Sequence, residues 1–347
     1  MNKYIIDSFS TNKGIGTDGG SEFALRLVDF CQVSGIDFLC IDSSKSEDRN
    51  ILQDLDLGKC IYVDPLFVRV SPFVNFTRFK KVVFVVHGAR IFEKPYSKDA
   101  YFYFTGISKL KVFILSKIFN KRLKNRTAKY IREIDEISNA EILSPSVHTK
   151  YVLRQLVNTR VQVFPPFWKK YEGELVCINN LPANYILVLG GDRWVKNTRR
   201  LIEIFTKLKN QGFLTNMSLV VVGLEKQEKR EDLIYFDYLK LGELHFLYKH
   251  CSASAFLSYN EGFGYPPMDA LSWGKPVLCT SVSAPNLIYH TGVIFCDPNN
   301  NIEIGSRLLY LYDLLVDDNS FNDIEMVRFT SSFSHELELQ WLRYLLG

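Results

Sequence analysis

Short apolar runs alternate with longer mixed stretches along the whole chain. Many of these runs are rich in Val and Ile and are apolar at consecutive rather than alternate positions. Strands buried on both faces, between helix layers of a parallel sheet, show this pattern. It predicts strands at residues 4–7, 37–41, 59–63, 82–87, 142–144, 161–164, 185–189, 219–222, 234–236, 255–257, 277–280 and 293–295.

Helical stretches follow these strands in both halves of the chain, which predicts two doubly wound α/β domains with parallel sheets. The boundary is expected near "FPPFWKKYEGE", where Pro165 and Pro166 end a strand. The predicted domains are therefore residues 1–166 and 167–347.

The composition fits this architecture. The chain has 347 residues, of which 47% are hydrophobic and 23% are charged, as in soluble globular proteins of two domains. No apolar run approaches the ~20 residues of a membrane span. Its 7 cysteines are scattered and include no CxxC pair, which favours free thiols in a reducing cytosol over disulfides or a zinc site.

Charge is unevenly distributed. The net charge of +4 combines about +10 in residues 1–170 with about −6 in residues 171–347. The segment from Lys109 to Arg132 holds nine Lys and Arg and no acid, with apolar residues at roughly helical spacing. It predicts a basic amphipathic helix, which would either lie on an anionic membrane surface or pack on its own domain. The expected membrane-facing cations are Lys121, Arg122, Lys124 and Arg126.

A nucleic-acid surface is not predicted, because the chain has no zinc finger and no aromatic RNA-binding signature. Another motif, "DLD" at Asp54–Asp56, matches a metal-binding pattern of other sugar transferases. No apolar strand precedes it to hold the two acids, so no metal site is expected there.

A glycine-rich stretch, "GIGTDGG" at residues 14–20, opens the first predicted helix. Its backbone could approach a phosphate or a sugar closely. The spacing also fits a dinucleotide fingerprint, with Asp42 as the ribose-binding acid. However, the polar spacer "SFSTNK" separates the glycines from the preceding strand, and a dinucleotide site turns directly from strand to glycine. A flexible turn is the remaining alternative.

Two further predicted strands end at polar side chains. His87 follows "VVFVV" and could hydrogen-bond into a crevice at the strand ends, or serve only a structural role. In "YILVLGGDRWVKN", Arg193 and Lys196 follow a strand and precede a helix from Thr198. Two cations beside a helix N-terminus suit a diphosphate, with solvated loop charges as the alternative.

The stretch "NEGFGYPPMDALSWGKPV", residues 260–277, has the most specific pattern. Glu261 follows a strand, and Gly262 and Gly264 leave the backbone N–H groups around Phe263 accessible. Two prolines then suit the start of a helix, predicted at residues 268–273 and ended by a glycine. Asp269 is expected in its first turn, where the helix dipole favours a carboxylate.

Taken together, these motifs resemble family 4 retaining glycosyltransferases, which have the GT-B fold of two facing Rossmann-like domains. "EGFGYPPMDALSWGKPV" is similar to the family's E-G-F-G-x-P-x-x-E-A-x-x-x-G-x-P-V, and "LGGDRWVKN" to its strand and loop with Arg and Lys. "VVHG" and "ILSPSVHTKYVLRQ" resemble family segments of the first domain. The sequence departs from the family at Asp269, Gly88 and Asn286, where the family often has Glu, Asp and an acid.

The resemblance implies a role for each motif. Arg193 and Lys196 would neutralise the leaving diphosphate, beside the Gly262–Phe263–Gly264 backbone. Asp269 would bind the ribose, and Gly16 would approach the phosphates or the acceptor. Glu261 and His87 would act as the catalytic pair by holding the reacting sugar.

It also implies a nucleotide diphosphate-sugar donor, with a GDP-mannose-like one favoured, and retention at the anomeric carbon. The acceptor would be a lipid-linked saccharide in bacterial surface polysaccharide synthesis, on the inner face of the cytoplasmic membrane. No metal or other cofactor is expected, because Arg and Lys supply the positive charge. The last helix, about residues 333–347, would pack back on the N-terminal domain. Two alternatives are a nucleotide-sugar oxidoreductase or epimerase using the Gly14–Gly19 loop, and a non-catalytic scaffold.

Overall fold

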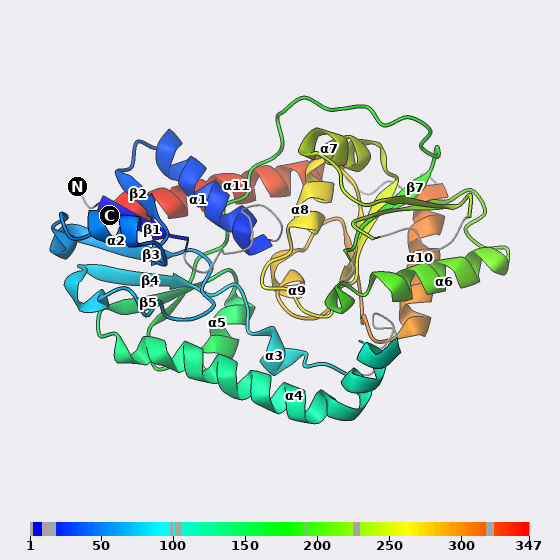
Figure 1. Cartoon of the computed structure of the whole chain (residues 1–347). Coiled ribbons are helices and arrows are strands. Elements are labelled where there is room, and N and C mark those ends of the chain that lie inside the picture. Colours follow the sequence, from blue (N-terminus) through cyan, green and yellow to red (C-terminus); the bar gives the residue numbers. More distant parts are fainter. Residues whose placement is uncertain are drawn as a thin grey trace. The chain divides into compact units, whose positions relative to one another are not determined.

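A computed structural model of the chain describes residues 3–8, 19–97, 100, 106–191, 193–224, 230–316 and 323–346 (Figure 1). The described chain divides into two compact units. The first comprises residues 1–95, 117–168 and 335–347, and the second comprises residues 96–116 and 169–334. Residues 96–116, from the N-terminal half of the sequence, are thus grouped with the second unit.

The first unit contains a parallel sheet in the order β2-β1-β3-β4-β5-β6. Its strands are β1 (Lys3–Asp7), β2 (Phe38–Ile41), β3 (Cys60–Asp64), β4 (Lys81–Val85), β5 (Ala140–Ser144) and β6 (Val161–Val163). Its helices are α1 (Gly19–Val33), α2 (Ser46–Ile51), α3 (Arg90–Glu93) and α5 (Val147–Leu153), with α4 (Gly106–Arg132) crossing the unit boundary.

Apolar side chains of this sheet fill two separate core layers because consecutive residues of a strand point to opposite faces. On one face, Tyr4 and Ile6 pack with α1 and with Trp341. On the other face, Ile5 belongs to a cluster that includes Ile134, after α4. Burial on both faces explains why these strands are continuously apolar in sequence.

The second unit repeats the plan with the order β12-β11-β10-β7-β8-β9, again all parallel. Its strands are β7 (Tyr185–Leu189), β8 (Ser218–Val222), β9 (Leu233–Phe236), β10 (Ala253–Phe256), β11 (Val277–Thr280) and β12 (Val293–Cys296). Its helices are α6 (Thr198–Asn210), α7 (Leu241–His250), α8 (Tyr265–Ser272), α9 (Pro285–Ile288), α10 (Asn301–Val316) and the start of α11 (Asp323–Leu346).

The end of α11 belongs to the first unit. Trp341 is 1% exposed, its ring lies 4.5 Å from that of Phe164, and its indole N–H donates to the carbonyl of Pro165 at 3.1 Å. The Tyr4 hydroxyl donates to the carbonyl of Leu345 at 2.7 Å. The last residues of the chain therefore complete a core layer that begins with β1.

The predicted strands are all present, with ends shifted by at most a few residues. The doubly wound α/β class is confirmed. None of the helices within the described ranges combines the length and apolarity needed to cross a bilayer. All seven cysteines are free, as predicted.

Candidate functional site in the second unit

The carboxyl end of β7 is where the strand order of the second sheet reverses. β8 lies on one side of β7 and β10 on the other, although β10 comes later in the chain. In open parallel sheets, ligands bind in the crevice at such a switch point. Arg193 and Lys196 follow β7, and Glu261 follows β10, so the fold brings these predicted site residues to one edge.

Glycine forms the ends of two adjacent strands at this edge. Gly191 after β7 has φ +73°, and Gly223 after β8 has φ +85°. A Cβ on Gly223 would lie 3.1 Å from the nitrogen of Gly191, which is too close for an ordinary contact. A Cβ on Gly190 would lie 2.5 Å from Oγ1 of Thr198. These strand ends therefore cannot carry side chains, and a ligand there meets main chain.

The central contact of the site is an ion pair. Lys196 Nζ lies 2.7 Å from Oε1 of Glu261, and the two side chains are only 15% and 17% exposed. Lys196 ends a 3-10 turn (Trp194–Lys196), and its ammonium also lies 5.4 Å from the ring centroid of Phe256. A half-enclosed ammonium beside a carboxylate can exchange that partner for a phosphate oxygen, since Lys binds as a movable point charge.

The glycine turn after Glu261 is fixed by several contacts. Gly264 has φ +93°, and a Cβ there would lie 3.2 Å from the Phe256 ring. The Tyr289 hydroxyl donates to the Gly264 carbonyl, and the backbone N–H of Glu261 donates to Oγ of Ser283 at 3.0 Å. Lys196 and Gly264 thus approach the same Phe256 ring, so the cation and the turn lie side by side.

Within this turn, Gly262 is half-buried, whereas Phe263 and Gly264 are buried. Phe263 is 5% exposed and its ring packs against Tyr265 and Phe333. Helix α8 starts at Tyr265, with prolines in its first turn that carry no N–H. Backbone donors at this helix start must therefore come mainly from the residues before the prolines, including half-buried Gly262.

The predicted position of Asp269 in its helix was wrong. Because α8 begins at Tyr265 rather than at residue 268, no acid lies in the first turn, and Asp269 falls in the second. The two prolines lie in the first turn of the helix, as their suitability for a helix start predicted. Asp269 therefore does not cap the helix. Its side chain is half-buried and near Tyr289, whose pKa is raised well above its usual value by burial and by the charges of Cys279, Asp269 and Glu261.

The remaining predicted cation, Arg193, is exposed at the start of the 3-10 turn. The turn ends at Asn197, which has φ +58° and is 1% exposed. The Asn197 side-chain amide donates to the Pro298 carbonyl at 2.9 Å and anchors the turn to the loop after β12. Two buried hydroxyls near this edge, on Thr198 and Ser258, have no hydrogen-bond partner within the described ranges.

The first-unit candidates are arranged differently. His87 lies in the loop after β4, its ring is 4.9 Å from that of Phe23, and it is half-buried. Its Nε2 lies 2.8 Å from the Pro65 carbonyl, which can only accept, so Nε2 carries a proton. The glycine candidates Gly14 and Gly16 lie outside the described residues, and α1 begins at Gly19.

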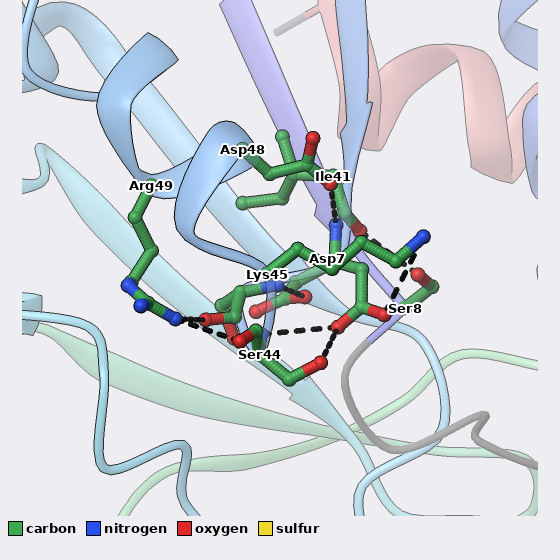
Figure 2. Close-up of polar contacts among 9 residues, drawn as sticks. Asp7, Ser8, Ile41, Ser44, Lys45, Asp48 and Arg49 are labelled. Carbon is green, nitrogen blue, oxygen red and sulfur yellow. Dashed lines mark hydrogen bonds and ion pairs between the residues drawn. The ribbon is translucent and has the colours of Figure 1, made fainter.

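The first-unit acids are bonded locally. Oδ1 of Asp42 accepts from the backbone N–H of Ser44 at 3.0 Å and from its hydroxyl at 2.6 Å. The Arg49 guanidinium donates to the Ser44 carbonyl at 2.8 Å (Figure 2). This turn occupies the carboxylate that a dinucleotide ribose would need. Asp56 pairs with Lys59 at 2.9 Å and precedes β3, at the opposite edge from the strand ends. No group of three potential metal ligands lies close together in the described part of the chain.

The part of the sequence that carries this site matches a known protein-family model. Residues 178–315 match the family model of glycosyl transferases group 1. This match lies within the second unit and covers less than half of the chain, while the two parallel sheets give the whole chain the GT-B fold. The matched range includes Arg193, Lys196, Glu261 and Asp269, but not His87.

Two curated proteins are similar in sequence. O-antigen chain mannosyltransferase B of Escherichia coli is 25% identical over 72% of this chain and 65% of its own length. O-antigen chain mannosyltransferase RfbU of Salmonella typhimurium is 23% identical over 34% of this chain and 35% of its own. The chain thus spans less than two thirds of the length of either relative.

Solved structures share the fold across the whole chain. Sucrose-phosphate synthase of Thermosynechococcus elongatus has a TM-score of 0.66 at 11% identity and covers 99% of this chain and 98% of its own. Anabaena HepE in complex with UDP and glucose has a TM-score of 0.59 at 10% identity, covering 99% of both chains. WaaG, a glycosyltransferase involved in lipopolysaccharide biosynthesis, has a TM-score of 0.57 at 14% identity and covers 100% of both.

Sequence reasoning missed the residues that hold the site in place. Ser283 and Tyr289 bond to the loop that carries Glu261, and Asn197 anchors the turn that carries Arg193 and Lys196 to Pro298. Their contacts cross between strands that are far apart in sequence, so no local spacing shows them. Asn197 and Ser283 both have positive φ. Because Asn is enriched in this conformation and Ser is not, the sequence could have indicated the first turn but not the second.

Proposed function

We propose that this protein is a retaining glycosyltransferase that transfers a hexose or deoxyhexose from a nucleotide diphosphate-sugar to a saccharide acceptor. The observation that carries the proposal is the Lys196–Glu261 pair beside the Gly262–Gly264 turn, inside the family-matched range. A cation, a positioning carboxylate and exposed backbone at a switch point are the groups that a diphosphate-sugar needs. The names of the two relatives favour a GDP-mannose-like donor and O-antigen synthesis.

In this proposal, Lys196 and Arg193 stabilise the diphosphate as it leaves, since charge develops on its oxygens during transfer. Lys196 moves from Glu261 toward the phosphate when donor binds, which frees Glu261 to hold a sugar hydroxyl. The leaving phosphate oxygen takes the acceptor hydroxyl proton on the same face of the sugar, so the anomeric configuration is retained. Asp269 binds the ribose. The Nε2 N–H of His87 leaves the Pro65 carbonyl and donates to the sugar instead.

Donor identity and transfer can be tested in sequence. A thermal-shift screen of GDP, UDP, dTDP and ADP should give one nucleotide that raises the melting temperature most, because only the native state binds it. Transfer is then measured with the matching radiolabelled sugar nucleotide and a lipid extract from surface-polysaccharide-producing bacteria. Product that disappears in Glu261→Gln but persists in Glu203→Gln, an exposed acid on α6, supports the proposal. Nucleotide binding without transfer or donor hydrolysis would instead indicate a non-catalytic binding subunit.

We further propose that the acceptor is lipid-linked and that α4 meets an anionic membrane surface on the cytoplasmic side. Ile107, Leu110, Ile114 and Ile118 on α4 are 73%, 57%, 61% and 55% exposed and fall three or four residues apart. Near the end of the same helix, in contrast, Ile131 is 2% exposed and belongs to the core of the first unit. An exposed apolar ridge on a helix with nine cations is the pattern of an interfacial helix.

Membrane binding is tested by co-sedimentation with vesicles that contain anionic lipid. Lys121, Arg122, Lys124 and Arg126 changed together to Gln should release the protein, and so should high salt, since exposed charges are screened over about 8 Å at physiological ionic strength. A control with Arg69, Arg78, Lys80 and Arg154 changed to Gln removes the same charge from other surfaces of the first unit. Equal release by both sets, or no release by either, would contradict a surface on α4.

A further inference from the structure

Tyr96 and Ala100 lie in the N-terminal half of the sequence, but they pack in the second unit. Ala100 is completely buried, in an apolar cluster with Trp194, Val195 and Tyr259, and half-buried Tyr96 packs against the same cluster. The family-matched range, residues 178–315, supplies the other members of this cluster. A piece of chain far from that range is therefore part of its core.

The cluster lies directly behind both loops of the candidate site. Trp194 and Val195 separate Arg193 from Lys196 in sequence, and Tyr259 comes shortly before Glu261. The backbone N–H of Tyr259 donates to the Val195 carbonyl at 2.8 Å and ties the two loops together.

Tyr96 extends this arrangement into a row of three tilted aromatic rings. Its ring centroid lies 5.6 Å from that of Trp194, at 35° between planes. Trp194 in turn lies 5.8 Å from Tyr259, at 41°. Aromatic pairs at these distances attract each other beyond simple area burial. Tyr96 thus covers the Trp194 ring on which the cation-bearing turn is built.

We propose that Tyr96 is a positioning residue for donor binding: its contact with Trp194 holds Arg193 and Lys196 in register with Glu261. This inference rests on the proposed function. Without the ring, the short turn from Arg193 to Asn197 samples more conformations, and a ligand must order it again on binding. That ordering cost falls on the groups that face phosphate, since the turn carries both cations.

The test compares Tyr96→Ala, Tyr96→Leu and Tyr96→Phe with Tyr238→Ala, which removes a Tyr that is 83% exposed in the same unit. Calorimetry measures binding of the nucleoside diphosphate found in the thermal-shift screen and of its nucleoside. Tyr96→Ala is expected to weaken the diphosphate about tenfold and the nucleoside less than about twofold. Tyr96→Phe should restore the diphosphate affinity, because the ring and not the hydroxyl contacts Trp194, and Tyr238→Ala should match wild type.

A second measurement needs no ligand. Acrylamide quenching of Trp194, isolated by subtracting the matching Trp194→Phe spectra, should increase in Tyr96→Ala and Tyr96→Leu but not in Tyr96→Phe. Unchanged quenching, or equal loss of nucleoside and diphosphate affinity, would overturn the positioning role. If wild type binds none of the nucleotides, the proposed function fails and this inference fails with it, whereas normal diphosphate binding by Tyr96→Ala overturns this inference alone.

Discussion

The carboxyl edges of the two sheets have the same architecture but different side chains. In the first unit, Asp7 and Asp64 end β1 and β3 at 1% and 2% exposure. Asp7 accepts from the Tyr62 hydroxyl at 2.6 Å and from the backbone N–H of Ser43 at 3.0 Å. The Asp7 carboxylate at this edge is therefore held by groups of the protein itself.

In the second unit, the equivalent edge combines glycine backbone with one half-enclosed ion pair. Gly191 and Gly223 leave the strand ends bare, and Lys196 and Glu261 lie beside them. Both sheets have a switch point, and the side chains at each one determine whether it can bind a ligand. Protein groups hold the Asp7 carboxylate at the first edge, while the second edge is suited to groups from a ligand. Each prediction below tests one side of this contrast.

The largest effect is expected from Glu261→Gln. The amide keeps the shape of the side chain but loses the charge that holds the sugar hydroxyl, and such positioning contributes several kcal/mol to a transfer barrier. Transfer should fall by about a hundredfold or more, while donor binding measured by calorimetry stays within about threefold. Glu203→Gln serves as the control. Transfer within tenfold of wild type would remove Glu261 from the site.

Thiol labelling should separate the two units when donor nucleotide is present. Burial raises the pKa of Cys251 in the second unit to about 12, and of Cys31 in the first to about 12, so both are unreactive until their unit opens. Nucleotide at a hundred times its Kd stabilises the unit that binds it by about 2.7 kcal/mol. In mild denaturant, bound nucleotide should slow the labelling of Cys251 about a hundredfold and that of Cys31 much less. Mass spectrometry of the labelled protein measures both rates. Equal protection of both thiols would contradict a donor site carried mainly by the second unit.

Two glycines with positive φ provide a matched pair. Gly264 (φ +93°) belongs to the candidate turn, and Gly274 (φ +69°) ends α8 away from it. Alanine at either position should lower the free energy of unfolding by about 1–3 kcal/mol, because an L side chain is strained there. Only Gly264→Ala should also lose transfer at temperatures where both variants are folded. Urea unfolding and the transfer assay measure the two effects, and parallel loss of transfer in both variants would refute a special role for the turn.

The smallest functional effect is expected from Asp7→Asn. The amide loses one acceptor oxygen of a buried network, which should lower the free energy of unfolding by about 1–3 kcal/mol. Nucleotide affinity should stay unchanged within error, because this carboxylate only completes the first sheet edge. Urea unfolding and calorimetry on the same preparation give both quantities. A clear loss of nucleotide affinity in folded Asp7→Asn would mean that the Asp7 carboxylate does more than complete the polar network of the first edge.

Much of the fold could be predicted from the sequence because a strand buried on both faces is a local pattern. Residues 185–189 and 277–280 are strands with the predicted bounds. The helix of Asp269 begins at Tyr265 rather than at residue 268, because the two prolines belong to its first turn. The strand order of the second sheet brings Lys196 close to Glu261, and the spacing of these two residues in the sequence does not reveal this. The packing of Ala100 with Trp194 joins residues of opposite halves and could not be anticipated at all.

Binding of the free nucleotide to a double variant tests the central claim most directly, namely that the second edge holds a nucleotide diphosphate. Arg193→Ala with Lys196→Ala is compared with Lys207→Ala plus Arg307→Ala, which removes an exposed Lys and an exposed Arg elsewhere in the same unit. Since hydrogen bonds to charged groups contribute about 1.5–3 kcal/mol each, the first variant should bind the diphosphate about a hundredfold more weakly. Its affinity for the nucleoside should change less than about threefold, and the control should match wild type. Equal loss for both ligands, or diphosphate binding that survives the double substitution, would contradict the account.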